Sequence, residues 1–118
     1  MSPDSEIRPV SSPAPGEGNQ PSREILSLAI YEPLPGQEQA SVSTMQELLA
    51  ALAARGYSRD RLYRDGKSQY VLLRYWKSPE ARRAAQEDPE ILRCWAKLAH
   101  EIRIVKVYES LEELDGIG

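Results

Sequence analysis

Residues 69–76 constrain the fold more than any other part of this 118-residue chain. The segment is dense in Tyr, Val and Leu, as β-strands prefer, and side chains along a strand alternate between two faces. One face presents Tyr70, Leu72, Arg74 and Trp76, and the other presents Val71, Leu73 and Tyr75. Bulky residues on both faces predict a strand whose sheet is covered on both sides.

Three further segments have strand-like patterns: residues 25–31, 59–64 and 102–108. The first is a short apolar run that Pro33 and Pro35 end, which predicts a strand buried on nearly both faces. Asp65-Gly66 separates the second segment from residues 69–76 and predicts a tight hairpin turn.

Two helical regions separate these strands. In the first, apolar residues recur at helical spacing: Met45, Leu48, Leu49 and Leu52. A capping box from Thr44 to Glu47 would start this helix, or Ser41 or Ser43 would cap it one turn earlier, and Gly56 would end it. The second region is broken, because Ser78-Pro79-Glu80 and Asp88-Pro89-Glu90 each have the cap, first-turn proline and acid that begin a helix.

The predicted order is strand, helix, strand, strand, broken helix, strand. This is the βαββαβ pattern of an α+β, ferredoxin-like fold with an antiparallel sheet, in which the helices cover one face. The face with Val71, Leu73 and Tyr75 then has no cover from its own chain. An apolar patch of that size in water favours association, so we expect a homodimer through the open sheet face.

Composition separates a tail from the domain. Residues 1–22 are rich in Pro, Ser and Gly and predict a disordered tail, residues 23–110 form the predicted domain, and residues 111–118 form a short acidic tail. The start lacks the pattern of a secretory signal and no apolar run is long enough to span a bilayer, so we expect a cytoplasmic protein without membrane contact. Cys94 is the lone cysteine, and neither a disulfide nor a cysteine-based metal site is expected.

Charge argues against nucleic acid as a partner. The formal net charge is −3, and acidic and basic residues are interleaved without a basic stripe. RNA-recognition domains share the predicted strand order, but they need a spacing of aromatic and basic residues on their central strands that this sequence lacks.

The stretch from Tyr70 to Ala81, YVLLRYWKSPEA, resembles the antibiotic biosynthesis monooxygenase-like family. In that family a strand ends in tryptophan, and a short polar turn precedes an acid and an alanine that open a helix. Asp88-Pro89 and the closing strand through Tyr108 also agree with the family pattern, so the resemblance covers roughly residues 23–109. It implies a dimeric α/β barrel, in which two ferredoxin-like sheets pack face to face and each subunit has a pocket between sheet and helices.

The resemblance also implies a range of functions. Some members are monooxygenases that act on aromatic polyketides or quinols without a cofactor, and we expect a small aromatic or quinol-type ligand here. The alternative is a non-catalytic dimeric module that binds a small molecule or a partner. A haem-handling protein is a weaker alternative, because residues 83–87 lack the histidine that haem-degrading members place on the second helix. We expect no cofactor and no metal.

Five residues are candidates for the site. Trp76 would form a flat wall against an aromatic ligand, and Tyr70 and Arg74 on the same face would offer a phenol and a fixed cation to an anionic quinol or phenolate. Tyr31 would line the pocket mouth or the dimer seam. The alternatives are packing for Trp76, a cross-strand contact for Tyr70 and a salt bridge for Arg74. His100, the one histidine, would take a proton in catalysis, or else face solvent near a helix end.

Two residues in the second half of the chain, Trp95 and Cys94, are predicted to pack in the core rather than to act in the site. Trp95 falls with Ile91 and Leu98 on one helical stripe, which predicts a place in the core. Cys94 has no neighbour in sequence that would lower its pKa, which predicts a buried and unreactive thiol.

Overall fold

The computed structural model describes residues 24–66 and 68–114, and they form one four-stranded sheet with three helices. The elements in chain order are β1 (Ile25–Pro33), α1 (Glu38–Ala54), β2 (Ser58–Arg64), β3 (Tyr70–Trp76), α2 (Pro79–Ala85), α3 (Pro89–Leu98) and β4 (Ile102–Leu111). The predicted element order is confirmed. The predicted tail of residues 1–22 lies outside the described residues, and β4 extends one residue into the segment predicted as the C-terminal tail.

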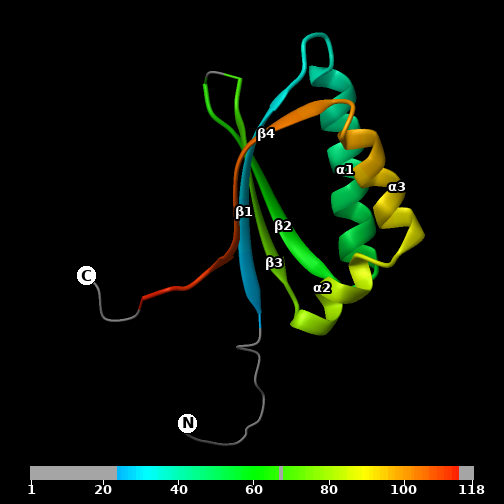
Figure 1. Cartoon of the computed structure of the whole chain (residues 1–118), viewed down its shortest axis with the longest axis vertical. Coiled ribbons are helices and arrows are strands. Elements are labelled where there is room, and N and C mark those ends of the chain that lie inside the picture. The colour runs from blue at the N-terminus through cyan, green and yellow to red at the C-terminus, as the bar shows by residue number, and fades with distance from the viewer. Residues whose placement is uncertain (1–23, 67, 115–118) are drawn as a thin grey trace, which may run out of the picture.

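The sheet has the strand order β2-β3-β1-β4, and every neighbouring pair is antiparallel. This is the ferredoxin-like α+β arrangement that the sequence predicts. Figure 1 shows α1 and α3 side by side over one face of the sheet, with α2 at one end of it. No helix of the described residues lies on the other face.

Two of the predicted helix starts are confirmed. Ser78 caps α2 by accepting a hydrogen bond from the Ala81 amide, and Asp88 caps α3 by accepting one from the Glu90 amide. Each cap precedes a proline in the first turn, where the missing amide hydrogen has no helical partner to lose.

The predicted caps of the first helix are wrong. α1 begins one turn or more earlier, at Glu38, after a turn in which Gly36 has a φ of +78°, and Gln37 makes no side-chain cap. Ser41 and Thr44 lie inside the helix instead. The Ser41 hydroxyl donates to the Glu38 carbonyl and the Thr44 hydroxyl donates to the Glu101 carboxylate, so both are satisfied without capping. The predicted helix end is confirmed, because Gly56 follows the C-cap with a φ of +71°.

The hairpin between β2 and β3 also differs from the tight turn that Asp65-Gly66 predicts. Arg64 pairs with Tyr70, so the connection takes residues 65–69. The Asp65 amide donates to the Gln69 carbonyl, and the Asp65 carboxylate accepts from the Gln69 amide. The positive φ falls on Ser68, at 95°, rather than on Gly66. The longer loop closes through the Asp65 side chain, which a two-residue turn does not require.

The core lies between the helices and one face of the sheet. Its fully buried members include Tyr31, Leu48, Leu52, Ile91 and Cys94. The prediction that Cys94 is buried is confirmed, and burial raises the pKa of its thiol. Among the described residues no helix combines the length and the apolar character needed to cross a membrane.

The opposite face, which we call the open face, is only half-buried or exposed. It presents apolar and aromatic residues from all four strands: Leu26, Leu28, Ile30, Tyr63, Val71, Leu73, Tyr75, Tyr108 and Leu111. In the single chain Tyr31 is the one buried residue of β1, so burial of this strand on nearly both faces stays a prediction that depends on a cover for the open face. The separate expectation that the open face lacks cover from this chain agrees with the described residues.

Candidate functional site

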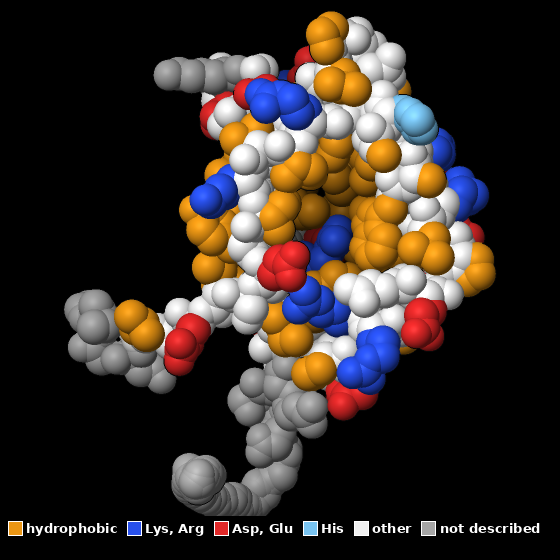
Figure 2. All heavy atoms as spheres, viewed as in Figure 1, with side chains coloured by type: hydrophobic (Ala, Val, Ile, Leu, Met, Phe, Trp, Pro, Cys, Tyr) orange, Lys and Arg blue, Asp and Glu red, His pale blue; other side chains and the backbone are white. Residues whose placement is uncertain are grey.

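A cleft runs between the sheet and the helices, on the side where β4 forms the sheet edge. It consists of two adjoining lobes with volumes of 260 and 410 Å³, which share Ala29, Leu72, Arg74 and Trp95. Figure 2 shows this hollow between the helices and the edge of the sheet, with hydrophobic side chains around it and basic side chains at its floor. The cleft is large enough for a small organic ligand.

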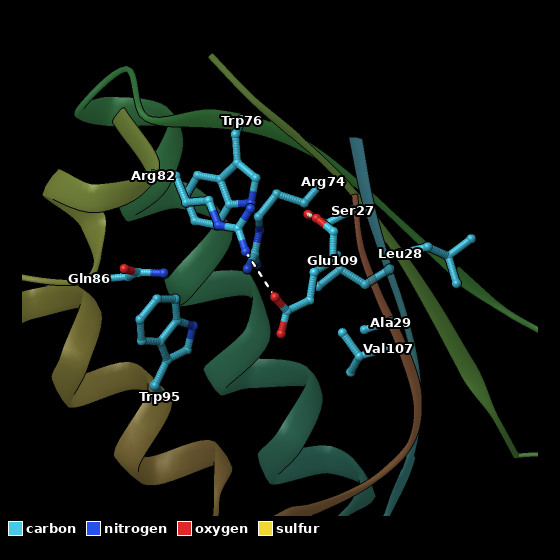
Figure 3. A pocket seen from close by; sticks show the side chains of 11 residues that line it. Ser27, Leu28, Ala29, Arg74, Trp76, Arg82, Gln86, Trp95, Val107 and Glu109 are labelled. Atoms are coloured by element: carbon cyan, nitrogen blue, oxygen red, sulfur yellow. Dashed lines mark hydrogen bonds and ion pairs between the residues drawn. The ribbon is translucent and has the colours of Figure 1, made fainter. Parts of the chain in front are cut away.

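Two indoles and a β4 side chain form much of the smaller lobe. Trp76, at the end of β3, is 5 % exposed and lies opposite Trp95 of α3 in Figure 3. Val107 of β4 lines the same lobe, although it is 46 % exposed. Aromatic walls of this kind suit a flat ligand, because ring faces and edges attract one another at stacking distances.

β4 contributes to the cleft because its register shifts twice. The pairing with β1 is irregular between Ile30 and Tyr31 and again between Leu26 and Leu28, so β4 has extra residues at both places. The Ser27 hydroxyl donates to the Glu109 carbonyl at 2.8 Å beside the second irregularity. Bulges re-aim side chains at sheet edges, and here Glu109 lines the smaller lobe.

Arg74 lies where the two lobes meet and is held by a buried carboxylate. Its Nε donates to Asp60 Oδ2 at 2.5 Å, and the Ser58 hydroxyl donates to Asp60 Oδ1 at 2.7 Å. The Arg74 guanidinium also lies 5.4 Å from the centre of the Trp76 ring. Nη2 of Arg74 is buried and has no hydrogen-bond partner within the described residues, so one strong donor is left for a ligand.

Tyr31 provides a second unpartnered donor, in the larger lobe. Its side chain is 1 % exposed, and its buried hydroxyl has no hydrogen-bond partner among residues 24–66 and 68–114. Burial and the neighbouring Tyr70 raise the pKa of Tyr31 to about 12, so the phenol keeps its proton at neutral pH and acts as a donor. The two rings stack with centroids 5.3 Å apart, and the Tyr70 hydroxyl donates to Glu38 at 2.8 Å.

An ion pair crosses the smaller lobe at its rim. Arg82 of α2 and Glu109 of β4 approach to 3.2 Å, drawn as the dashed line in Figure 3. Glu109 is 76 % exposed, so water screens this pair and its contribution to stability is small.

The structure brings together three of the five predicted site residues. Trp76, Arg74 and Tyr31 all line the cleft. Tyr70 does not: it lies behind Tyr31 with its hydroxyl bound to Glu38, as the cross-strand alternative predicts. His100 is exposed in the turn after α3 and is not among the residues that line either lobe.

Other cleft residues were not predicted from the sequence. Trp95 was assigned to the core, but it is only partly buried and lines both lobes. Trp95 lies at one edge of the helical stripe formed by Ile91 and Leu98, and this position is the signal that would have predicted a side chain lining the cleft. Asp60, Arg82 and Glu109 have no such signal, because charged residues on three separate elements meet only in the folded chain.

The described residues contain no group of three or more His, Cys, Asp or Glu side chains placed to hold a metal ion. The site instead offers aromatic surfaces, two donors without partners, and one carboxylate at the rim. Aromatic surfaces and hydrogen-bond donors of this kind suit a flat molecule that bears an oxygen atom.

Solved structures share this fold across most of the chain. A candidate antibiotic biosynthesis monooxygenase from Chloroflexus aurantiacus superposes with a TM-score of 0.65 at 18 % identity, covering 80 % of this chain and 97 % of that one. SnoaB, a cofactor-independent oxygenase from Streptomyces nogalater, gives a TM-score of 0.63 at 21 % identity, covering 79 % and 98 %. PA3566 from Pseudomonas aeruginosa gives 0.69 at 19 % identity, covering 81 % and 99 %.

These similarities confirm the fold that the sequence resemblance implies, the ferredoxin-like fold of solved antibiotic biosynthesis monooxygenases. No protein-family model and no curated protein matches the sequence itself.

Proposed function

From the fold of the antibiotic biosynthesis monooxygenases, we propose that this protein is a cofactor-independent oxygenase that acts on a small aromatic or quinol-type molecule. One observation carries the proposal: a cleft with aromatic walls contains two buried donors, Arg74 Nη2 and the Tyr31 hydroxyl, that lack partners among the described residues. Buried polar groups are nearly always hydrogen-bonded, so these two donors are available to a ligand oxygen or to water. SnoaB, which has the same fold, is a cofactor-independent oxygenase.

The proposed reaction needs no electron carrier, because the substrate reduces the oxygen. For an anthrone, the ring CH₂ becomes a carbonyl. One oxygen atom of O₂ enters that carbonyl, and the other leaves as water with the two hydrogens. The carbon gives up four electrons and O₂ accepts four, so the step balances.

The residues of the cleft have separate roles in this reaction. Trp76 and Trp95 hold the ring system, and the donors on Arg74 and Tyr31 stabilise the negative charge that develops on the substrate oxygen when a proton leaves. Glu109 lines the smaller lobe, and we assign it the role of proton acceptor.

Oxygen uptake with a panel of anthrones and hydroquinones tests the proposal. We expect turnover by the unaltered protein and at least a ten-fold loss in kcat/KM for Arg74→Met, which keeps the side-chain bulk and removes the donor. Leu92→Ala, an exposed position on α3, is the matched control and should retain full activity. Ligand-induced thermal stabilisation without oxygen uptake would replace the oxygenase with the non-catalytic binding module.

We also propose that the open face binds a second copy of the chain. Tyr63, Tyr108 and Leu111 on this face are 53 %, 43 % and 37 % exposed, which is costly for a contiguous apolar surface in water. The resemblance to the antibiotic biosynthesis monooxygenase-like family implies a face-to-face dimer, and such a pairing would cover this surface. Sedimentation equilibrium at micromolar concentration should give twice the chain mass, and a single-chain mass would refute the dimer.

A further inference from the structure

We propose that the cleft selects ligands that are electrically neutral where they meet Arg74, and that Asp60 is the positioning residue that sets this preference. The inference rests on the proposed function and narrows its substrate class to aromatic molecules with a carbonyl or hydroxyl oxygen. Aromatic carboxylates and phosphates are excluded.

The first step is the pairing of the cleft's central cation. The Asp60 side chain is 2 % exposed and the Arg74 side chain is 11 % exposed, so water screens their charges little. Their contact at 2.5 Å fixes the guanidinium through Nε, and Ser58 holds the other carboxylate oxygen. Arg74 therefore offers Nη2 as an oriented donor, while the charge of the pair is zero.

The second step is the charge of the whole cleft. The charged residues among those that line its two lobes are Arg74, Arg82 and Glu109. Arg82 is paired with Glu109 at 3.2 Å, as Figure 3 shows, and Arg74 is paired with Asp60. Each arginine thus has its own carboxylate, and no net positive charge remains for an anion.

The third step compares the two kinds of ligand. A carboxylate placed on Nη2 would lose its hydration, and the Asp60 charge on the other side of the guanidinium would offset part of its attraction to Arg74. A neutral carbonyl loses far less on leaving water and gains the same hydrogen bond. The cleft therefore favours the neutral oxygen.

The preference for neutral ligands is also consistent with the proposed oxygenase reaction. When a neutral substrate gives a proton to Glu109, one negative charge moves from the rim to the substrate oxygen. The total charge of the cleft stays the same, and Arg82 becomes free to face the new anion. A substrate that entered as an anion would instead bring a second negative charge into the cleft.

Matched pairs of neutral and anionic ligands test the preference. The probes are 2-acetylnaphthalene against 2-naphthoate, and anthraquinone against its 2-carboxylate, with binding followed by the fluorescence of Trp76 and Trp95, the chain's two tryptophans. We expect the neutral member of each pair to bind the unaltered protein at least ten-fold more tightly. Equal or tighter binding of the carboxylates would overturn the inference.

Asp60→Asn tests the positioning residue, because the amide keeps the acceptor for Arg74 Nε and removes the charge. We expect the ratio of neutral to anionic affinity to fall by at least ten-fold. A ratio within one protein is insensitive to a general loss of stability. Glu47→Gln removes one charge from an exposed pair with Arg93, outside both lobes, and should leave the ratio unchanged.

The remaining outcomes are also decisive. An unchanged ratio in a folded Asp60→Asn protein refutes the role of Asp60. If this variant does not fold, Glu109→Gln takes its place and should shift the ratio in the same direction by a smaller factor. A preference for the neutral ligands without oxygen uptake would support the inference and refute the oxygenase. Oxygen uptake together with tight carboxylate binding would support the oxygenase and refute the inference. If no member of either pair binds, the inference is refuted, and oxygen uptake with the anthrones and hydroquinones decides the oxygenase separately.

Discussion

The two faces of the sheet are built from the same strands yet carry opposite kinds of surface. On β3, Leu72, Arg74 and Trp76 face the helices, and Leu73 and Tyr75 face the other way. The helix side contains a buried ion pair and two unpartnered donors. On the open face the cations lie against aromatic rings in the solvent layer: Arg59 is 4.1 Å from the Tyr75 ring centre, and Lys106 is 5.4 Å from that of Tyr108.

The comparison teaches that burial of charge, rather than apolar content, distinguishes the two surfaces. Both are rich in Leu, Val and aromatic residues. Arg59 on the open face forms an exposed pair with Glu24, whereas Arg74 on the helix side is enclosed with Asp60. A buried ion pair is a weak source of stability, so stability alone does not explain why the helix side encloses one.

The largest expected effect comes from separating the enclosed pair. Asp60→Ala leaves the Arg74 charge buried without a partner, so we expect a loss of about 3–5 kcal/mol in the free energy of unfolding, measured by urea titration. Glu109→Ala breaks the exposed pair with Arg82 and should cost less than about 1 kcal/mol. Equal losses for the two variants would contradict the contrast between the enclosed pair and the exposed pair.

A charge placed on the open face gives the next effect. Leu73→Asp should leave the subunit folded and weaken the proposed dimer by about 2 kcal/mol or more, because a carboxylate would lose its water in the interface. Analytical ultracentrifugation should show the shift to single chains. Leu92→Asp, on the exposed side of α3, is the control and should leave the assembly intact.

Removal of one aromatic wall should have a smaller effect that is confined to the ligand. Trp95→Ala is expected to weaken the binding of 2-acetylnaphthalene by about 1 kcal/mol, through the loss of ring contact. Quenching of the remaining Trp76 fluorescence measures the change. Tyr63→Ala removes an aromatic side chain from the open face, and the same titration should show no change.

The smallest effect concerns the free phenol of Tyr31. Its pKa is raised by burial from 10.0 to about 12, so the unfolded chain releases this proton first as the pH rises. The stability that the neutral phenol contributes is complete below pH 10 and is lost between pH 10 and about 12.

Tyr31→Phe keeps the ring stack on Tyr70 and removes the titrating group. We expect it to equal the unaltered protein within about 1 kcal/mol at pH 7, since the lost hydroxyl has no partner within the described residues. Melting temperatures from pH 8 to 11.5 should fall less steeply for the variant. If the melting temperatures of the two proteins fall equally with pH, the pKa of Tyr31 is not raised in the folded protein.

The sequence placed a candidate residue in the cleft correctly where its position follows from strand alternation. Trp76 and Arg74 share a face because they are two residues apart, and Tyr31 joins them through its pairing with Tyr70. His100 was chosen for its chemistry without a positional argument, and it lies in an exposed turn outside the lobes. Asp60 was missed because its partner is 14 residues away, on the next strand.

The sequence by itself determined the order of elements, the helix starts at Ser78 and Asp88, and the division of β3 into two bulky faces, because each depends on local geometry and short-range periodicity. Only the tertiary structure decided which charges meet and which donors stay free. The Asp60–Arg74 contact depends on strand register, and the place of Glu109 depends on two irregularities in β4. Register and bulges arise from contacts between distant segments, and no local pattern encodes them.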